Sequence, residues 1–331
     1  MKVCIHYPNL HGTPAFESAR LRKTLKGACE FAGINWEDQI SPNTEIAHFL
    51  SPLDEKNLLK CKKRGIKTVV SCFYCENDFH ASFLQDDGGK KEISDLAIKM
   101  MNEADLVLVP TDSLAAKAKE KGAKSKIKVL GVGVNLSRFS SKSIEADIFP
   151  RYFRVRPEDK LVICVGSYED EKTVDSLVKI ASLTPKMRFY FFGSKRRFKL
   201  PFIYKKPRKK TPPNLVFEPV VEDDVYRSAL MHCVSYLLLD GEHPDQMALM
   251  DAFAAGAEVV ALGEQNANPI LENGKNCLLF KSEKEASLGL SRLYLEKDKA
   301  IIMAGYAIAE SHALPCFAKQ LRETYEELLL N

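Results

Sequence analysis

The most unusual chemistry in the sequence is a run of cations with aromatic side chains between them. Residues 195–210 (KRRFKLPFIYKKPRKK) contain nine basic side chains and no acidic one. Such a segment suits a solvated loop, an anionic membrane surface whose headgroup region takes up the aromatic rings, or nucleic-acid phosphates and bases. The candidate membrane or polyanion contacts are Lys195, Arg196, Arg197, Lys205, Lys206, Arg208, Lys209 and Lys210.

A second basic run lies at residues 56–64, where helical spacing is expected, and it is either a solvated helix face or a second membrane-facing surface. The net charge of the whole chain is only +4, so the chain outside residues 195–210 carries a negative balance. A protein that binds nucleic acid over its whole surface would be basic throughout. We therefore do not expect a nucleic-acid partner, and an anionic membrane surface remains a candidate partner.

The cysteines indicate neither a disulfide framework nor a metal site. Nine cysteines is an odd number for a chain of 331 residues, which favours free thiols. Cys72 and Cys75 have C-x-x-C spacing, but one such pair without a second is a weak zinc signal. We expect no metal and no cofactor. Because the sequence also has no apolar run of membrane-spanning or signal-peptide length, it predicts a cytoplasmic protein. If the basic segments bind an anionic membrane, as one of the interpretations above has it, they would meet its inner face.

The sequence predicts two series of alternating strands and helices, and these elements would position the candidate side chains. The first has strands at 3–7, 45–50, 66–72, 105–110 and 127–130 and helices at 15–32, 54–64, 90–103 and 113–121. The second has strands at 161–165, 188–192, 215–217, 233–239, 258–262 and 277–280 and helices at 173–182, 223–230, 247–255 and 283–296. Repeated βα units predict parallel sheets covered by helices. The pattern breaks at 140–157, so we expect an α/β protein with Rossmann-like βαβ domains at 1–145 and 150–310, facing a central cleft.

Five segments, in order, resemble the retaining family-4 glycosyltransferases of the GT-B fold. In the second half they are LVICVGSYEDEK (161–172), DAFAAGAEVV (251–260) and NPILENGKNCLLF (268–280). In the first half, ADLVLVPTDS (104–113) and GVGVNLSRF (131–139) are similar to the last N-domain strand and the interdomain turn of that family. The resemblance implies that the first domain takes the acceptor and the second the nucleotide-sugar donor. The last amphipathic helix is predicted at 314–330, and the resemblance implies that the segment 311–331 containing it crosses back to the first domain.

The same resemblance implies a set of site residues. Lys172 stands where the family has its phosphate-binding lysine, and Asp251 where it has its ribose-binding glutamate. Glu242 or His243 would take the catalytic position that contacts the donor sugar. The remaining donor-binding candidates are Gly12, Gly166, Ser167 and Asn268.

Several positions depart from the family pattern. Ser167 replaces the usual arginine, Asp251 is shorter than the usual glutamate, and Phe73 replaces an N-domain histidine. Two interpretations therefore stay open. In the first, the protein transfers a hexose from a UDP- or GDP-linked sugar to a glycan or lipid-linked acceptor and retains the anomeric configuration. In the second, it is a non-catalytic relative that acts as an accessory or binding protein.

Overall fold

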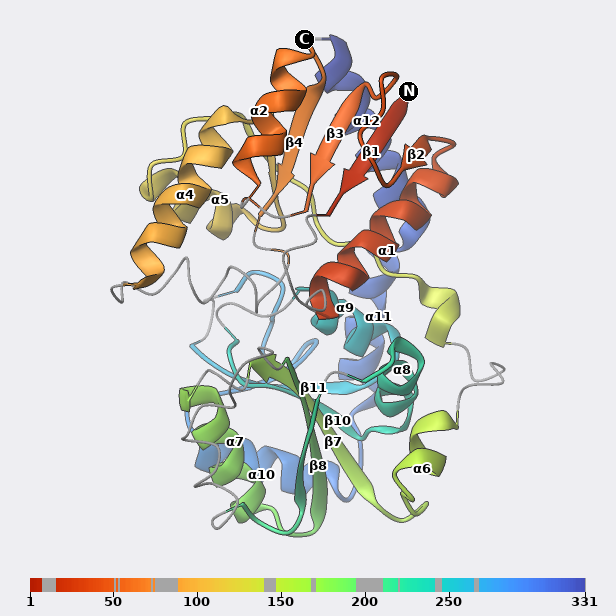
Figure 1. The fold of residues 1–331 in the computed structure, drawn as a ribbon. Coiled ribbons are helices and arrows are strands. Elements are labelled where there is room, and N and C mark those ends of the chain that lie inside the picture. The colour runs from red at the N-terminus through yellow and green to blue at the C-terminus, as the bar shows by residue number, and fades with distance from the viewer. Residues whose placement is uncertain are drawn as a thin grey trace. The chain divides into compact units, whose positions relative to one another are not determined.

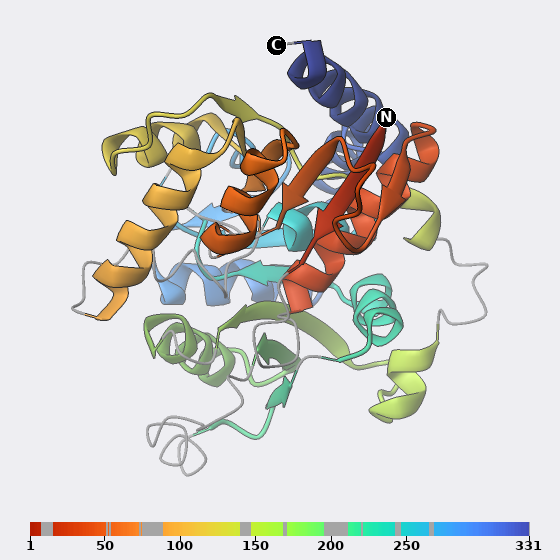
Figure 2. The ribbon, with the colours of Figure 1, turned by 45° about the horizontal axis from the view of Figure 1, so that its top comes forward.

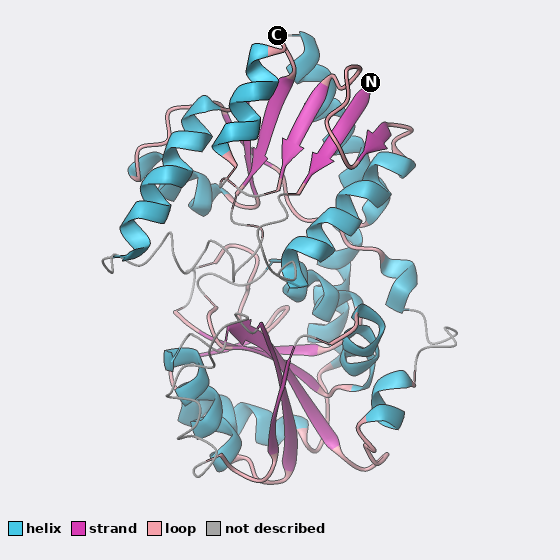
Figure 3. Ribbon diagram, viewed as in Figure 1, coloured by secondary structure: helices cyan, strands magenta, loops and turns pink. Residues whose placement is uncertain are grey.

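The computed structural model describes residues 1–7, 16–50, 52, 54–72, 74, 89–139, 147–167, 171–194, 211–219, 221–241, 246–264 and 268–330. The chain divides into two compact units (Figure 1). The N-terminal unit contains residues 1–134 together with 312–331, and the C-terminal unit contains residues 135–311. In both, a parallel sheet carries helices on its faces, as the colours of Figure 3 show.

The sheet of the N-terminal unit has the strand order β2-β1-β3-β4-β5-β6, with every neighbouring pair parallel. The strands are β1 (Lys2–His6), β2 (Asn35–Glu37), β3 (Ile46–Phe49), β4 (Lys67–Ser71), β5 (Leu106–Val109) and β6 (Ile127–Val129). The central strands read as nearly continuous apolar runs, because both faces of a parallel sheet are covered. Successive side chains point to opposite faces, and β3 shows what each face meets.

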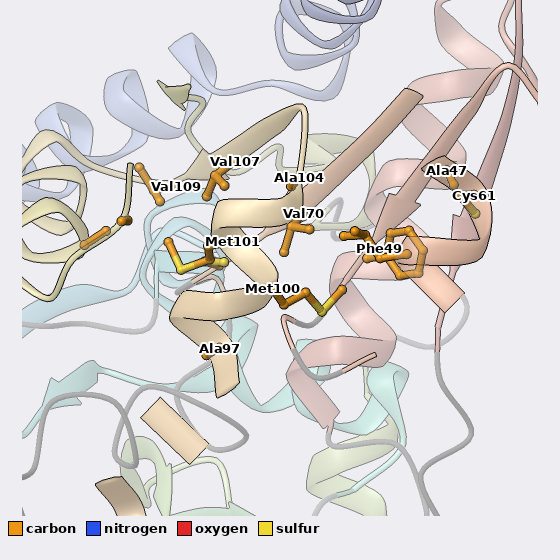
Figure 4. Close-up of a cluster of buried hydrophobic side chains, with 14 of the residues drawn as sticks. Ala47, Phe49, Cys61, Val70, Ala97, Met100, Met101, Ala104, Val107 and Val109 are labelled. Atoms are coloured by element: carbon orange, nitrogen blue, oxygen red, sulfur yellow. The ribbon is translucent and has the colours of Figure 1, made fainter. Parts of the chain in front are cut away.

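Ala47 and Phe49 of β3 point into an apolar core with Val70, Met100 and other side chains (Figure 4). The helices over that face are α2 (Glu55–Lys63), α4 (Gly89–Glu103) and α5 (Asp112–Glu120). His48, between them in sequence, points the other way and contacts the last helix, α12 (Leu314–Leu330). That helix lies beside α1 (Phe16–Phe31), so the two ends of the chain pack together in this unit (Figure 1 and Figure 2).

The sheet of the C-terminal unit has the order β12-β11-β10-β7-β8-β9, again all parallel. Its strands are β7 (Lys160–Ser167), β8 (Met187–Ser194), β9 (Leu215–Pro219), β10 (Ser235–Leu238), β11 (Glu258–Leu262) and β12 (Leu278–Phe280). Counted from β7, this is the 3-2-1-4-5-6 order of a dinucleotide-binding Rossmann sheet. The chain therefore winds outward in both directions from β7.

Helices cover both faces of this second sheet. Phe189 and Phe191 of β8 pack with side chains of α7 (Glu171–Leu183) and α10 (Glu283–Leu293). Tyr190 and Phe192 of the same strand meet Phe149 of α6 (Ile148–Tyr152), and Phe192 also meets a tyrosine of α8 (Asp223–His232). Two further helices, α9 (Gln246–Ala254) and α11 (Lys299–Ser311), pack on each other and on β11.

The structure differs from the sequence-based expectations in four respects. Strand β2 and helix α11 were not predicted, and α6 lies inside the stretch at 140–157 that the sequence suggested was irregular. The boundary between the units falls after Val134, earlier than the expected 145–150. A short 3₁₀ helix, η2 (Leu136–Phe139), then opens the C-terminal unit. Residues 312–331, which include α12, belong to the N-terminal unit.

Candidate functional site

The strand order of the C-terminal unit indicates where that unit binds a ligand. The connections from β7 run to one side through β8 and to the other through β10, so the loops that follow β7 and β10 diverge. In open parallel sheets, ligands bind at such a switch point, outside the carboxyl ends of the strands. Strand β7 ends at Ser167 and β10 at Leu238, which makes the loops after these two residues the candidate site.

Gly166 lies at the carboxyl end of β7, beside Gly193 of β8. A Cβ atom on Gly166 would come within 3.1 Å of the Phe191 ring, so a larger residue would press on the core beneath the loop. Ser167 is the last residue of the strand and is in register with Ser194. Both strands thus end in a glycine followed by a serine.

Lys172 is the second residue of α7, and its side chain is exposed. It makes no ion pair or hydrogen bond with any residue in the described part of the chain. The first turn of a helix has free backbone N–H groups and the positive end of the helix dipole, and together these attract phosphate. An unpaired ammonium group in that turn adds a full positive charge to the same position. The location is suited to a diphosphate.

Asp251 belongs to α9, the helix that follows β10, and every residue of this helix is buried. Its own side chain is only 9% exposed. A buried carboxylate is costly unless polar or charged groups compensate it, so an aspartate in this helix is unlike the surrounding apolar residues. Helix α11 holds α9 in place through a close approach, because a Cβ on Gly305 would lie 2.5 Å from the ring of Phe253.

Asn268 begins a segment whose backbone is hydrogen-bonded by side chains of the same segment. Its Oδ1 accepts a hydrogen bond from the backbone N–H of Ile270 at 2.9 Å, and the residue is 6% exposed. Further along, Asn276 accepts from the N–H of Glu272 at 3.0 Å and donates to the carbonyl of Ile270 at 2.8 Å. These bonds fix the backbone of residues 268–276, ahead of β12. The Oδ1 of Asn268 is therefore engaged in this turn.

One residue at this edge escaped the sequence analysis. Gly241 follows β10, and its N–H donates to the carbonyl of Leu262 at the end of β11, at 2.6 Å. A Cβ at Gly241 would lie 2.7 Å from that carbonyl oxygen. The close approach directs the chain as it leaves β10. A glycine three residues after the end of an apolar strand was the available signal, since such a glycine often marks a close approach of two backbone segments.

The structure describes some of the predicted site residues, and others lie outside the described ranges. Gly166, Ser167, Lys172, Asp251 and Asn268 all belong to the C-terminal unit, at the carboxyl ends of its strands or in the helices and loops that follow. Four predictions lie outside the described residues: Gly12, Glu242, His243 and the basic segment 195–210. Phe73 and Cys75 lie outside them as well.

The described thiols and carboxylates form no metal site. Among the residues that the structure describes, no three His, Cys, Asp or Glu side chains gather as a metal would require. Eight cysteines in those ranges are free, and all except Cys316 are buried. Burial raises the pKa of the Cys29 thiol to about 12, which keeps it protonated and unreactive. Within the same ranges no helix is both long and apolar enough to cross a membrane.

Comparison with known proteins was made by sequence and by structure. No protein-family model matches the chain. The chain is 21% identical over 309 residues to a processive diacylglycerol alpha-glucosyltransferase of Acholeplasma laidlawii, an alignment that covers 92% of this chain and 91% of that protein.

Solved structures match along nearly the whole length. Anabaena HepE in complex with UDP-glucose gives a TM-score of 0.73 at 14% identity, covering 99% of this chain and 100% of that one. Sucrose-phosphate synthase of Thermosynechococcus elongatus gives 0.71 at 13% identity, covering 98% and 82%. The two-domain α/β architecture is therefore the GT-B fold that the sequence motifs indicated.

Proposed function

The chain is a relative of the GT-B glycosyltransferases, and from that premise we propose that it transfers a hexose from a UDP-sugar to a lipid-linked or glycan acceptor. One observation carries the proposal: similarity to a glucosyltransferase extends over 92% of the chain. The C-terminal unit adds a phosphate-suited helix start and a buried aspartate on the helix after β10. The donor keeps its anomeric configuration in this proposal.

The proposed roles follow the chemistry of a nucleotide-sugar. Lys172 and the first turn of α7 neutralise the diphosphate as it leaves, with Gly166 and Ser167 offering backbone beside it. Asp251 accepts hydrogen bonds from the two ribose hydroxyls, since a carboxylate has acceptor sites for both. Glu242 or His243 contacts the donor sugar, while Gly12 and Asn268 line the donor. Catalysis of this kind rests on positioning and electrostatic stabilisation, without a metal or cofactor.

The acceptor is proposed to be lipid-linked, for two reasons. The full-length sequence relative is named for a diacylglycerol acceptor. The exposed cations of α2, at Lys56, Lys60 and Lys63, supply positive charge in the N-terminal unit, while Lys62 is paired with Glu103. Residues 195–210 add nine basic side chains to the sequence. Each cation near an anionic bilayer contributes about 1 kcal/mol of attraction. The protein would then work on the cytoplasmic side, attached to the membrane surface.

Calorimetric titration with a panel of UDP-sugars tests the donor site. We expect UDP-glucose or a related donor to bind, and Lys172→Ala or Asp251→Asn to weaken binding about tenfold, equivalent to about 1.4 kcal/mol. Lys284→Ala is the matched control, because Lys284 is likewise exposed and the second residue of a helix, α10, but that helix follows the edge strand β12. A folded protein that binds no UDP-sugar would contradict the transferase and favour an accessory role.

A further inference from the structure

A cluster of lysines lies at the amino edge of the first sheet, opposite the edge where parallel sheets bind ligands. Residues 117–128 contain six lysines, one acidic residue, Glu120, and no arginine or aromatic residue. They span the last turn of α5, the turn after it and the first residues of β6. Lys119, Lys124 and Lys126 are exposed, and their side chains make no ion pair or hydrogen bond with any described residue. These three are called the amino-edge lysines below.

Hydrogen bonds fix the backbone that carries these side chains. Gly122 follows α5 with a φ of 103°, a left-handed conformation that ends the helix and turns the chain toward β6. Asn102, near the end of α4, donates from Nδ2 to the carbonyl of Gly122 at 3.1 Å and accepts at Oδ1 from the N–H of Lys124 at 2.6 Å. The carbonyl of Lys126 accepts from the N–H of Val107 in β5 at 2.9 Å. The lysines therefore stand on a defined surface.

Two structural effects explain other lysines of the segment. A cation in the last turn of a helix interacts favourably with the helix dipole, which accounts for Lys117. A lysine on an edge strand discourages pairing with another chain, and Lys128 lies on the edge strand β6, where it also pairs with Glu327 at 2.8 Å. Neither effect accounts for Lys124, which lies between the helix and the strand. Unpaired like charges repel one another, so a partner of opposite charge would compensate the cluster.

An anionic bilayer does not fit this edge. Segments that enter the headgroup region combine cations with aromatic or large apolar side chains, as residues 195–210 do, whereas residues 117–128 expose no such side chain. Strand β4 has five residues, so at about 3.3 Å per residue the two edges of the sheet are about 16 Å apart. A bilayer at the amino edge would hold a lipid-linked acceptor that far from the carboxyl edge.

Nucleic acid fits the edge no better. Single strands are bound by stacking bases on aromatic rings, and phosphates are bound most specifically by the planar guanidinium of arginine. Residues 117–128 contain neither group. A lysine ammonium group is a point charge on a flexible stem, which suits carboxylates that stand at variable positions on a protein surface.

We propose that the amino-edge lysines bind an acidic protein, whose aspartate and glutamate side chains pair with them. This inference goes beyond the proposed function and does not depend on it. Charge complementarity of this kind speeds association and selects the partner more than it adds affinity. The end of α4 separates this surface from α2, because Glu103 pairs with Lys62 on one side while Asn102 bonds to Gly122 on the other. The carboxyl edge of the sheet stays accessible while the partner is bound.

The test measures the binding of fluorescent poly-L-glutamate, a probe that presents carboxylates without phosphate or lipid. The parent protein carries glutamine in place of the nine basic side chains of residues 195–210, so that this segment does not contribute. The main variant adds Lys119→Gln, Lys124→Gln and Lys126→Gln to the parent. Since exposed ion pairs are individually weak, we expect the three changes together to weaken binding about tenfold. Binding to the parent should vanish as salt rises from about 0.05 M to about 0.5 M.

A matched variant separates a site from net charge. Lys284→Gln, Lys299→Gln and Lys319→Gln remove the same charge from three other exposed positions, which lie on α10, α11 and α12. We expect this variant to bind poly-L-glutamate within about twofold of the parent, because distant exposed charges are screened by salt. An unchanged melting temperature confirms that both variants are folded.

The possible outcomes are distinct. If the main variant binds as tightly as the parent, or if the matched variant loses as much affinity as the main one, the amino-edge lysines form no site. Phosphatidylglycerol vesicles and duplex RNA are the alternative probes. A greater loss of affinity in the main variant for either of these than for poly-L-glutamate would assign the edge to a bilayer or to nucleic acid and overturn the proposal. UDP-sugar binding is measured in parallel, and its failure would contradict the proposed function without affecting this one.

Discussion

His48 and Tyr325 form a buried hydrogen bond in the N-terminal unit, with the imidazole Nδ1 2.6 Å from the phenol oxygen. The other nitrogen, Nε2, lies 2.7 Å from the hydroxyl oxygen of Ser71. Both His48 and Tyr325 are fully buried. Three polar groups from β3, β4 and α12 thus satisfy one another inside an apolar layer, and the last helix of the chain is tied to the sheet of the first residues.

Removing the phenol should destabilise this unit. Tyr325→Phe keeps the ring but leaves one buried nitrogen of His48 without a partner, which costs about 1–3 kcal/mol. Urea unfolding followed by the fluorescence of Trp36, the chain's single tryptophan, reports on this unit because Trp36 is in β2. Tyr152→Phe, at a position 75% exposed, is the control and should change nothing. An unchanged urea midpoint for Tyr325→Phe would show that the hydrogen bond adds no stability.

The same histidine should make stability depend on pH. Burial lowers the pKa of His48 from 6.5 to about 3. A group whose folded pKa is lowered stabilises the fold above its unfolded pKa, and that stability is lost as pH falls toward the folded pKa. The free energy of unfolding should therefore decline between pH 6.5 and pH 3, by at most about 1.4 kcal/mol per pH unit from this group. The carboxylate of Glu37, whose pKa is lowered to about 2, adds its own loss only below its usual value of 4.5.

The measurement is urea unfolding, followed by Trp36 fluorescence, at a series of pH values between 7 and 5, above the usual pKa values of Asp and Glu side chains. In His48→Gln the side chain does not titrate, so the decline over this range should flatten. A wild-type midpoint that is constant from pH 7 to pH 5 would contradict the prediction.

Glu258 in the C-terminal unit should show the opposite trend. Its Oε2 accepts from the N–H of Asp298 at 2.8 Å, while Oε1 is buried with no partner among the described residues. Burial raises the pKa of this carboxyl group. Stability from a raised carboxyl pKa is present at low pH and lost as pH rises through the folded value. Glu258→Gln removes the buried charge, so we expect it to stabilise this unit by about 1 kcal/mol at pH 7. Calorimetric unfolding at pH 7 and at pH 4.5 should show that the gain shrinks at the lower pH; a loss at pH 7 would refute it.

Gly305 should be intolerant of a methyl group. Alanine normally stabilises a helix relative to glycine by about 1 kcal/mol. Here the added Cβ would overlap the Phe253 ring, and overpacking of a core costs about 1–3 kcal/mol. We expect Gly305→Ala to lower the melting temperature and, by displacing α9, to weaken UDP-sugar binding. Met303→Ala, on the same helix but 65% exposed, is the control. A rise in melting temperature would show that the two helices can separate without cost.

The sequence predicted the elements whose signal is local. Helix α12 and strand β11 have the predicted bounds, Leu314–Leu330 and Glu258–Leu262. The helix is recognisable from its amphipathic period and the strand from its β-branched apolar run, and both signals lie within the segment itself. Strand β2 escaped because its three residues, Asn35–Glu37, have no buried side chain. Asp251 lies in α9 as predicted, whereas Lys172 lies in the first turn of α7, one residue before the predicted start of that helix at 173.

Pairings between distant residues were decided by the tertiary structure alone. His6 meets Asp54, and His48 meets Tyr325, only because parallel strands bring their carboxyl ends to one edge and α12 packs on the first sheet. The sequence around a single histidine in a strand does not indicate whether its side chain is buried, exposed or hydrogen-bonded. The sequence by itself therefore determined the βα order and the kind of fold. The tertiary structure determined which polar side chains contact one another, because hydrogen bonding and burial depend on residues that are distant in the sequence.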